Sequence, residues 1–150
     1  MDFDLLVVGA GAGGLMTAAR LASLGYRTLV AERLGHLGGR ASTRDVDGFK
    51  INNGAIVIET GGIIEQTFVE VGGFDRARIL FTVVTRDDWP PQRAVAGSDL
   101  PPGTPVANLW NVGDGVKEYA NGGITACAET AQIVARQVAE RYPAGLTPRP

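Results

Sequence analysis

The stretch DLLVVGAGAGG, residues 4–14, decides the fold of this chain. Its apolar run leads directly into three glycines spaced G-x-G-x-x-G, namely Gly9, Gly11 and Gly14. A helical pattern and a second apolar run follow, and Glu32 ends that run 23 residues after Gly9. Strand, glycines, helix and acid in this order are the fingerprint of a dinucleotide-binding fold, although the glycine spacing alone is weak evidence. A carboxylate at Glu32 would accept a hydrogen bond from a ribose 2′-hydroxyl and repel a 2′-phosphate, which disfavours NADP.

Each glycine of this turn meets a separate steric requirement. Gly9 lets the chain turn sharply off the strand, Gly11 lets a pyrophosphate approach the backbone, and Gly14 lets the helix lie close to the sheet. The phosphates would meet N–H groups at the positive end of the helix, where Ala12 and Gly13 lie. The alternative is that these glycines only close a tight turn.

Length and composition are those of an ordinary globular chain. It has 150 residues, which predicts one domain, with 45% hydrophobic and 20% charged residues. A net charge of -2 without a basic run argues against nucleic-acid binding. Cys127 is the single cysteine, which excludes an internal disulfide and favours a cytoplasmic location. His36 is the single histidine, which argues against a Cys/His metal cluster. Asp2 and Asp4 open the chain where a signal peptide would be basic, and no apolar run is long enough to span a membrane.

The rest of the chain alternates predicted strands and helices. Continuous apolar runs predict buried parallel strands over 3–8 and 28–31, with a third strand over 77–84, while helical spacing predicts helices over about 13–24 and 63–71. Asp47-Gly48 predicts a β-hairpin between 41–46 and 49–51. The loop 33–40 ends in Gly38-Gly39-Arg40, where exposed N–H groups beside a cation suit phosphate oxygens, or form an ordinary surface loop. Prolines and glycines exclude regular structure over 85–106.

The last unit predicts a strand over 107–112 and a helix opened by Gly122-Gly123, with apolar residues at helical spacing. Asp114 follows the strand, at the edge where open parallel sheets bind ligands. Its carboxylate could accept hydrogen bonds from sugar hydroxyls. The alternative is a turn or helix-capping aspartate.

Together these motifs resemble the FAD-dependent oxidoreductases of the phytoene desaturase, carotenoid isomerase and amine oxidase type. The matching pieces are residues 7–15, Glu32-Arg33 with Gly38-Gly39-Arg40, and residues 109–114 with Gly122-Gly123. The resemblance implies an α/β, Rossmann-like FAD-binding domain with a central mostly parallel sheet, helices on both faces and a small β-hairpin. It implies one domain over 1–142, with an N-terminal half 1–72 and a C-terminal half 77–142, followed by a tail over 143–150.

The resemblance also implies which residues hold FAD. The pyrophosphate would lie on Gly9, Gly11, Ala12, Gly13 and Gly14, and the adenosine ribose on Glu32. The middle of the cofactor, towards the flavin, would be lined by Arg33, Gly38, Gly39 and Arg40. Gly113 and Asp114 would take the ribityl or pyrophosphate region. The pyrimidine edge of the flavin would meet Gly123, Ile124 and Thr125, and the adenine would meet the backbone near Val83 or Val84.

The chain departs from this family between its two halves. Family members carry a large substrate domain there, whereas only a short stretch separates residues 71 and 108 here, and Asn52-Asn53 stands where an acid often precedes Gly54. No constellation of acid, base and nucleophile is evident, since His36 is interpreted as a loop residue and Cys127 as a helix-core residue. We therefore expect an FAD-binding module that lacks most of the substrate domain.

Two alternatives remain open. One is a small FAD-dependent oxidoreductase that acts through an exposed or dimer-covered flavin, and the other is an NAD-binding Rossmann protein without flavin. In the module, surface that a substrate domain would cover must be buried or altered, which predicts either a homodimer or a face made polar by substitution.

Overall fold

A computed structural model of the chain describes residues 2–53, 62–72, 77–81, 100–116 and 123–145. Strands and helices follow one another along it in a mixed order, as an α/β fold requires. They are β1 (Leu5–Val8), α1 (Ala12–Ser23), β2 (Thr28–Glu32), the short 3-10 helix η1 (Gly39–Ala41), β3 (Thr43–Val46), β4 (Phe49–Asn52), α2 (Ile63–Glu70), β5 (Ala77–Phe81) and α3 (Gly123–Arg141). Every helix predicted from the sequence is present.

Three strands form a parallel sheet with β2 in the middle, in the order β1-β2-β5. Leu5 pairs with Thr28 at the start of the ladder, and Thr28 pairs in turn with Ala77 of β5. Because β1 and β2 run parallel, they need a crossover connection, and α1 supplies it. The third strand predicted over 77–84 is confirmed over 77–81, and the remainder of that prediction lies outside the described residues.

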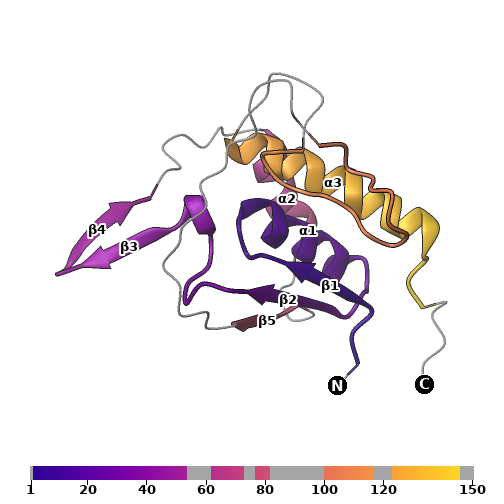
Figure 1. Cartoon of the computed structure of the whole chain (residues 1–150), viewed down its shortest axis with the longest axis horizontal. Coiled ribbons are helices and arrows are strands. Elements are labelled where there is room, and N and C mark those ends of the chain that lie inside the picture. Colours follow the sequence, from indigo (N-terminus) through magenta and orange to yellow (C-terminus); the bar gives the residue numbers. More distant parts are fainter. Residues whose placement is uncertain (1, 54–61, 73–76, 82–99, 117–122, 146–150) are drawn as a thin grey trace.

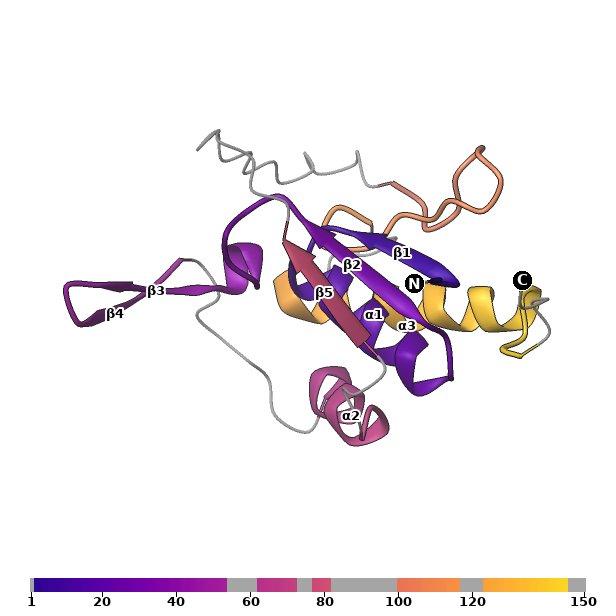
Figure 2. The same cartoon turned by 90° about the horizontal axis from the view of Figure 1, so that it is seen from below.

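The described helices all lie on one side of this sheet, as Figure 1 shows. Figure 2 shows the opposite side of the sheet facing the viewer, with α1 and α3 behind it. The prediction of an α/β, Rossmann-like fold is confirmed, whereas helices on both faces are not found in the described part of the chain. The core has two layers: α1 packs on the sheet around Ala18 and Val30, and α3 packs on α1 around Leu21 and Val134.

The face of the sheet turned away from the helices carries exposed apolar side chains. Val7 is buried beneath α1, whereas its neighbours Leu6 and Val8 are 60% and 81% exposed. Successive side chains of a strand point to opposite faces, so Leu6 and Val8 share the face without helices. The apolar run of β1 predicted burial on both faces, and among the described residues this holds for one face only.

The β3–β4 hairpin extends away from the sheet and helices (Figure 1). Val46 pairs with Phe49 across the turn, and Asp47 and Gly48 both have positive φ, 52° and 84°. Positive φ at both turn residues is the requirement of the tightest hairpin turn, so the prediction from Asp47-Gly48 is confirmed. Phe49 is 74% exposed, and Val46 and Ile51 are also exposed, which leaves an apolar face on the hairpin.

The strand predicted over 107–112 is wrong. Asn108 has a φ of 64°, and the N–H of Leu109 bonds to the carbonyl of Val106, so the chain turns at this point. The N–H of Asn111 then bonds to the carbonyl of Pro102 at 2.8 Å, which folds the segment back on itself. Trp110 makes a single bridge to Gly103 instead of joining the parallel sheet.

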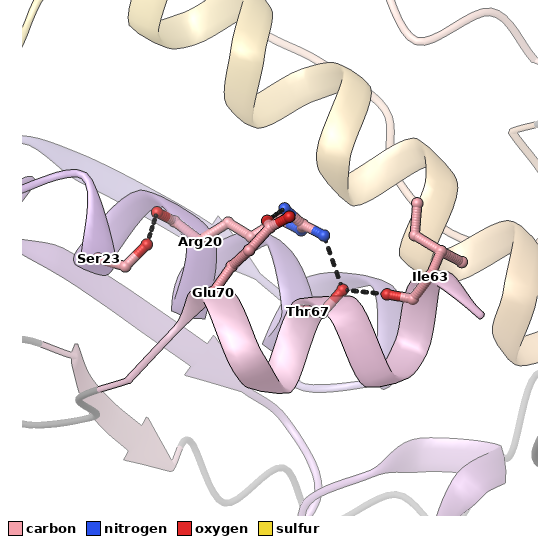
Figure 3. A network of polar contacts seen from close by, with 5 residues as sticks. All are labelled: Arg20, Ser23, Ile63, Thr67 and Glu70. Carbon is pink, nitrogen blue, oxygen red and sulfur yellow. Dashed lines mark hydrogen bonds and ion pairs between the residues drawn. The ribbon is translucent and has the colours of Figure 1, made fainter. Parts of the chain in front are cut away.

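A buried arginine of α1 binds two side chains of α2, as Figure 3 shows. Arg20 of α1 is only 6% exposed. One guanidinium nitrogen pairs with Glu70, and another donates to the Thr67 hydroxyl at 2.8 Å. That hydroxyl donates in turn to the carbonyl of Ile63, so the cluster links one end of α2 to the other.

Candidate functional site

In the glycine turn between β1 and α1, one glycine allows the helix to pack closely and another leaves the backbone open. Gly9 has a φ of +98° and turns the chain off the strand. A Cβ on Gly14 would lie 2.0 Å from the carbonyl oxygen of Gly9, so α1 can lie this close only because Gly14 has no side chain. A Cβ on Gly11 would meet no atom within 4 Å in the described structure, which leaves open space above the turn. The turn therefore packs α1 at one glycine and presents bare backbone at another.

A cavity of about 550 Å³ opens onto this bare backbone. Its wall combines the glycine turn, the loop before η1, the segment after residue 111 and the start of α3. Eleven of the predicted cofactor-binding residues lie in it: Gly9, Gly11, Ala12, Gly13, Gly14, Gly38, Arg40, Gly113, Asp114, Gly123 and Ile124. Residues more than 100 positions apart thus surround one space.

Four other predicted site residues lie outside the cavity wall: Glu32, Arg33, Gly39 and Thr125. Glu32 is buried at the end of β2, where its carboxylate accepts two backbone hydrogen bonds. Arg33 is exposed, and Gly39 begins η1 beside Gly11. Val84 lies outside the described residues. The roles that the resemblance implied for these residues stay predictions.

The two halves of the chain meet at the turn itself. A Cβ on Gly13 would lie only 2.8 Å from Cα of Gly113. The N–H of Gly113 donates to the Thr130 hydroxyl at 3.0 Å, which holds this segment on α3. The start of α1 and the segment at Gly113 are therefore in backbone contact, and neither half forms the cavity alone.

Asp114 connects three parts of the wall. One carboxylate oxygen accepts from the N–H of Gly123 at 2.7 Å, and the other lies 3.4 Å from the guanidinium of Arg40. The side chain of Arg40 is 43% exposed and that of Asp114 is 11% exposed. The sequence allowed a helix-terminal or a ligand-facing aspartate, and here one carboxylate binds the first N–H of α3 and also faces the cavity.

Sequence reasoning missed six residues of the wall: Val8, Ala41, Asn53, Val112, Gly115 and Cys127. Asn53 is held there by a bond from its side-chain amide to the Ser42 hydroxyl at 2.8 Å, which places the Asn52-Asn53 turn at the cavity. Cys127 is buried, as expected of a helix-core residue, yet it also faces the cavity. Its spacing of four from Gly123 could have indicated this, because residues i and i+4 share a helix face.

Burial raises the pKa of the Cys127 thiol, and the nearby Asp114 carboxylate adds to the shift. The thiol is thus held neutral at the junction of α1 and α3. Among the described residues, no three His, Cys, Asp or Glu side chains gather as metal ligands do. No described helix combines the length and apolarity needed to cross a membrane.

Fold and cavity together define a Rossmann-like dinucleotide-binding domain. Parallel strands, a glycine turn and a helix N-terminus facing an open space are the arrangement that this class uses for phosphates. Residues 7–70 match the family described as NAD(P)-binding Rossmann-like domain. The match runs from Val7, within β1, to the last residue of α2.

Curated proteins similar to this chain include two phytoene desaturases and a 4,4'-diaponeurosporene oxygenase. The chain is 37% identical over 67 residues to a phytoene desaturase of Cercospora nicotianae, covering 45% of this chain and 11% of that protein. It is 43% identical over 68 residues to a zeta-carotene-forming phytoene desaturase of Myxococcus xanthus, covering 45% and 13%. A 4,4'-diaponeurosporene oxygenase of Staphylococcus aureus is 33% identical over 68 residues, covering 45% and 14%. The resemblance to the phytoene desaturase type is confirmed over this part of the chain.

The chain spans only 11% to 14% of the length of these relatives. Among solved structures, an oxidoreductase from Methanosarcina mazei is 38% identical, with 45% of this chain and 17% of that chain covered and a TM-score of 0.43.

Proposed function

We propose that this chain binds FAD non-covalently, as a module that lacks most of the substrate domain of phytoene desaturase-type flavoproteins. One observation carries the proposal: two glycine-rich segments from opposite halves of the chain, at Gly11 and at Gly113, line one cavity. A nicotinamide protein has no special need for the second glycine-opened helix, whereas FAD would extend from the first segment to the second. The domain would span 1–142 as two halves, 1–72 and 77–142.

The residues of the wall fit the phosphates of a dinucleotide. The open space at Gly11 adjoins the N-terminus of α1, which no described side chain caps. A helix N-terminus offers N–H donors and a positive dipole end to an anion. Arg40 would add a charged donor, and Asp114 would accept from sugar hydroxyls. When bound, FAD supplies hydride and electron transfer, and the protein would orient it and limit its exposure to water.

Catalysis is the second candidate function. A small FAD-dependent oxidoreductase would expose its flavin or cover it with a second copy, and the uncovered apolar face at Leu6 supports a homodimer in either case. A third candidate is an NAD-binding Rossmann protein, favoured by the description of the matching family. The module is preferred over an enzyme because the described wall offers one buried thiol and one paired carboxylate, and no base beside a nucleophile.

The purified chain itself tests the proposal. We expect it to carry the visible absorption bands of oxidised flavin, or to acquire them when FAD is added, and to release FAD on denaturation. Titration should give an affinity for FAD at least about tenfold higher than for NAD, a difference of about 1.4 kcal/mol. A colourless chain that FAD does not reconstitute contradicts the proposal, and tighter binding of NAD supports the third candidate.

Activity is tested separately on the holoprotein. Anaerobic mixing with NADH, amines or polyenes should bleach the bound flavin no faster than free FAD if the chain is a binding module. Faster bleaching with any of these would favour the small oxidoreductase.

A further inference from the structure

The β3–β4 hairpin carries an apolar face that no described part of the chain covers. Val46 and Phe49 form a cross-strand pair, and Ile51 follows Phe49 by two residues, so these three side chains share one face of the hairpin. They are 45%, 74% and 49% exposed. A two-stranded hairpin is only marginally stable in water unless another surface packs on it. This face therefore calls for an apolar partner surface.

The second exposed apolar face is that of the parallel sheet, at Leu6 and Val8. The hairpin of the same copy does not cover it, because the hairpin extends away from the sheet in both views (Figures 1 and 2). We propose that two copies of this chain cover these faces for each other. The hairpin of one copy lies on the sheet face of the other, and two-fold symmetry makes this contact occur twice. This arm exchange goes beyond the proposed function and does not depend on it.

The apolar area of the two faces together is close to what a homodimer needs. Each copy contributes five large apolar side chains that are 45% to 81% exposed: Leu6, Val8, Val46, Phe49 and Ile51. Burying roughly 100 Å² of each would remove about 1,000 Å² from water in the symmetric pair. Stable interfaces bury about 1,200–2,000 Å² in total, part of it at a polar rim. Sheet-to-sheet or hairpin-to-hairpin packing would use only four or six of the ten side chains, and so falls well below this range.

The charges of the hairpin favour a protein surface over a lipid surface as its partner. Between residues 43 and 52, Arg44 and Lys50 are balanced by Asp45 and Asp47, and Lys50 is paired with Asp45. Segments that bind anionic membranes through an apolar face carry an excess of lysine and arginine. A hairpin without net charge lacks that attraction. The sheet face of a second copy is an apolar protein surface that this chain itself offers.

Two charge variants and their mixture test the arm exchange by sedimentation of the full chain. Leu6→Lys and Phe49→Glu should each raise the dissociation constant of the dimer about 100-fold or more, because each variant alters both symmetric contacts. An equal mixture of the two variants should form a heterodimer within about tenfold of the wild-type affinity. In that heterodimer one contact is unchanged, and the other places the introduced glutamate beside the introduced lysine.

Other arrangements of two copies give different results. In sheet-to-sheet packing, Phe49→Glu would dimerise like wild type, and in hairpin-to-hairpin packing Leu6→Lys would do so. Either result, or a mixture that stays monomeric, overturns the proposal. Thr43→Glu is the matched control, because Thr43 is exposed and its side chain alternates with that of Val46 onto the other face of the hairpin. It should dimerise like wild type, and loss of its dimer would contradict a contact through the apolar face.

Measurements on the wild-type chain keep the test decisive if a variant does not fold. The chain should sediment as a dimer, and amides of residues 43–52 should exchange about tenfold or more slowly at concentrations that favour the dimer than at those that favour the monomer. A monomeric wild type or unchanged exchange in the hairpin overturns the proposal. Monomeric chain that binds phosphatidylcholine vesicles would identify a lipid surface instead. Chain that dimerises as expected but does not bind FAD overturns the proposed function and supports the arm exchange.

Discussion

Gly11 and Gly14 both lack a Cβ, but the absence of this atom serves ligand binding at Gly11 and helix packing at Gly14. Two alanine variants distinguish these roles. In Gly14→Ala the new Cβ would collide with the backbone of Gly9, so helix and strand must move apart. We expect a loss of about 1–3 kcal/mol in the free energy of unfolding, as for other overpacked cores. Thermal or denaturant unfolding measures it.

Gly11→Ala should behave in the opposite way. Gly11 has a φ of -72°, which alanine adopts freely, and its Cβ would enter open space. The variant should unfold like wild type yet bind FAD at least about tenfold more weakly, because the new methyl group would occupy the approach of the pyrophosphate. Wild-type affinity in Gly11→Ala would place the phosphates elsewhere.

The pH dependence of chemical labelling at Cys127 probes the same cavity. Its burial raises the pKa of the thiol, so the reactive thiolate forms at higher pH in the folded chain than in the unfolded chain. Labelling with iodoacetamide should therefore be slow at neutral pH, rise with pH later than in denaturant, and slow further with FAD. It is the only cysteine in the sequence, so the mass of the labelled chain identifies the site. Identical pH curves for folded and denatured chain would contradict this placement.

Among the elements, the contact between α1 and α2 depends on a buried charge. Thr67→Val removes the hydroxyl that accepts from Arg20, and leaves a buried guanidinium N–H without that partner. We expect the free energy of unfolding to fall by about 1–3 kcal/mol. Glu70→Gln is the comparison: its side chain is 50% exposed, so its loss should be below about 1 kcal/mol. Equal losses in urea unfolding would show that the hydroxyl has no special role.

Elements that depend on local chemistry could be predicted, and those that depend on distant partners could not. The hairpin follows from Asp47 and Gly48, whose positive φ values are properties of two adjacent residues. The stretch 107–112 has a strand-like pattern, but a strand also needs a hydrogen-bonding neighbour, and here Asn111 finds Pro102 close by in sequence. Nothing in the apolar pattern distinguishes these two outcomes.

The same distinction applies to the candidate site. The glycine turn could be predicted because each glycine meets a steric requirement that arises from the adjacent strand β1 and helix α1. The approach of Gly113 to Gly13 was implied only by family resemblance, since 100 residues separate them. Cys127 could have been assigned to the wall from its spacing of four from Gly123, whereas no sequence pattern places Asn53 there.

For the whole molecule, the exposed face of the sheet predicts self-association. We expect a homodimer in sedimentation or light scattering, because a second copy would cover the apolar side chains at Leu6. Leu6→Lys should shift the chain to monomer, whereas Leu24→Lys, at an exposed leucine beyond α1, should not. Wild-type chain that stays monomeric at high concentration would contradict the homodimer.

The two ends of the described chain are tied to one short connection between α1 and β2. The N–H of Asp4 donates to the carbonyl of Arg27 at 2.9 Å, and the hydroxyl of Tyr26 donates to the carbonyl of Tyr142. Asp4 and Tyr142 are thus held against adjacent residues of this connection, and a linker between these two described segments would permit circular permutation. The order in which the two halves are synthesised would then be interchangeable, because their meeting point, and not their sequence order, builds the cavity.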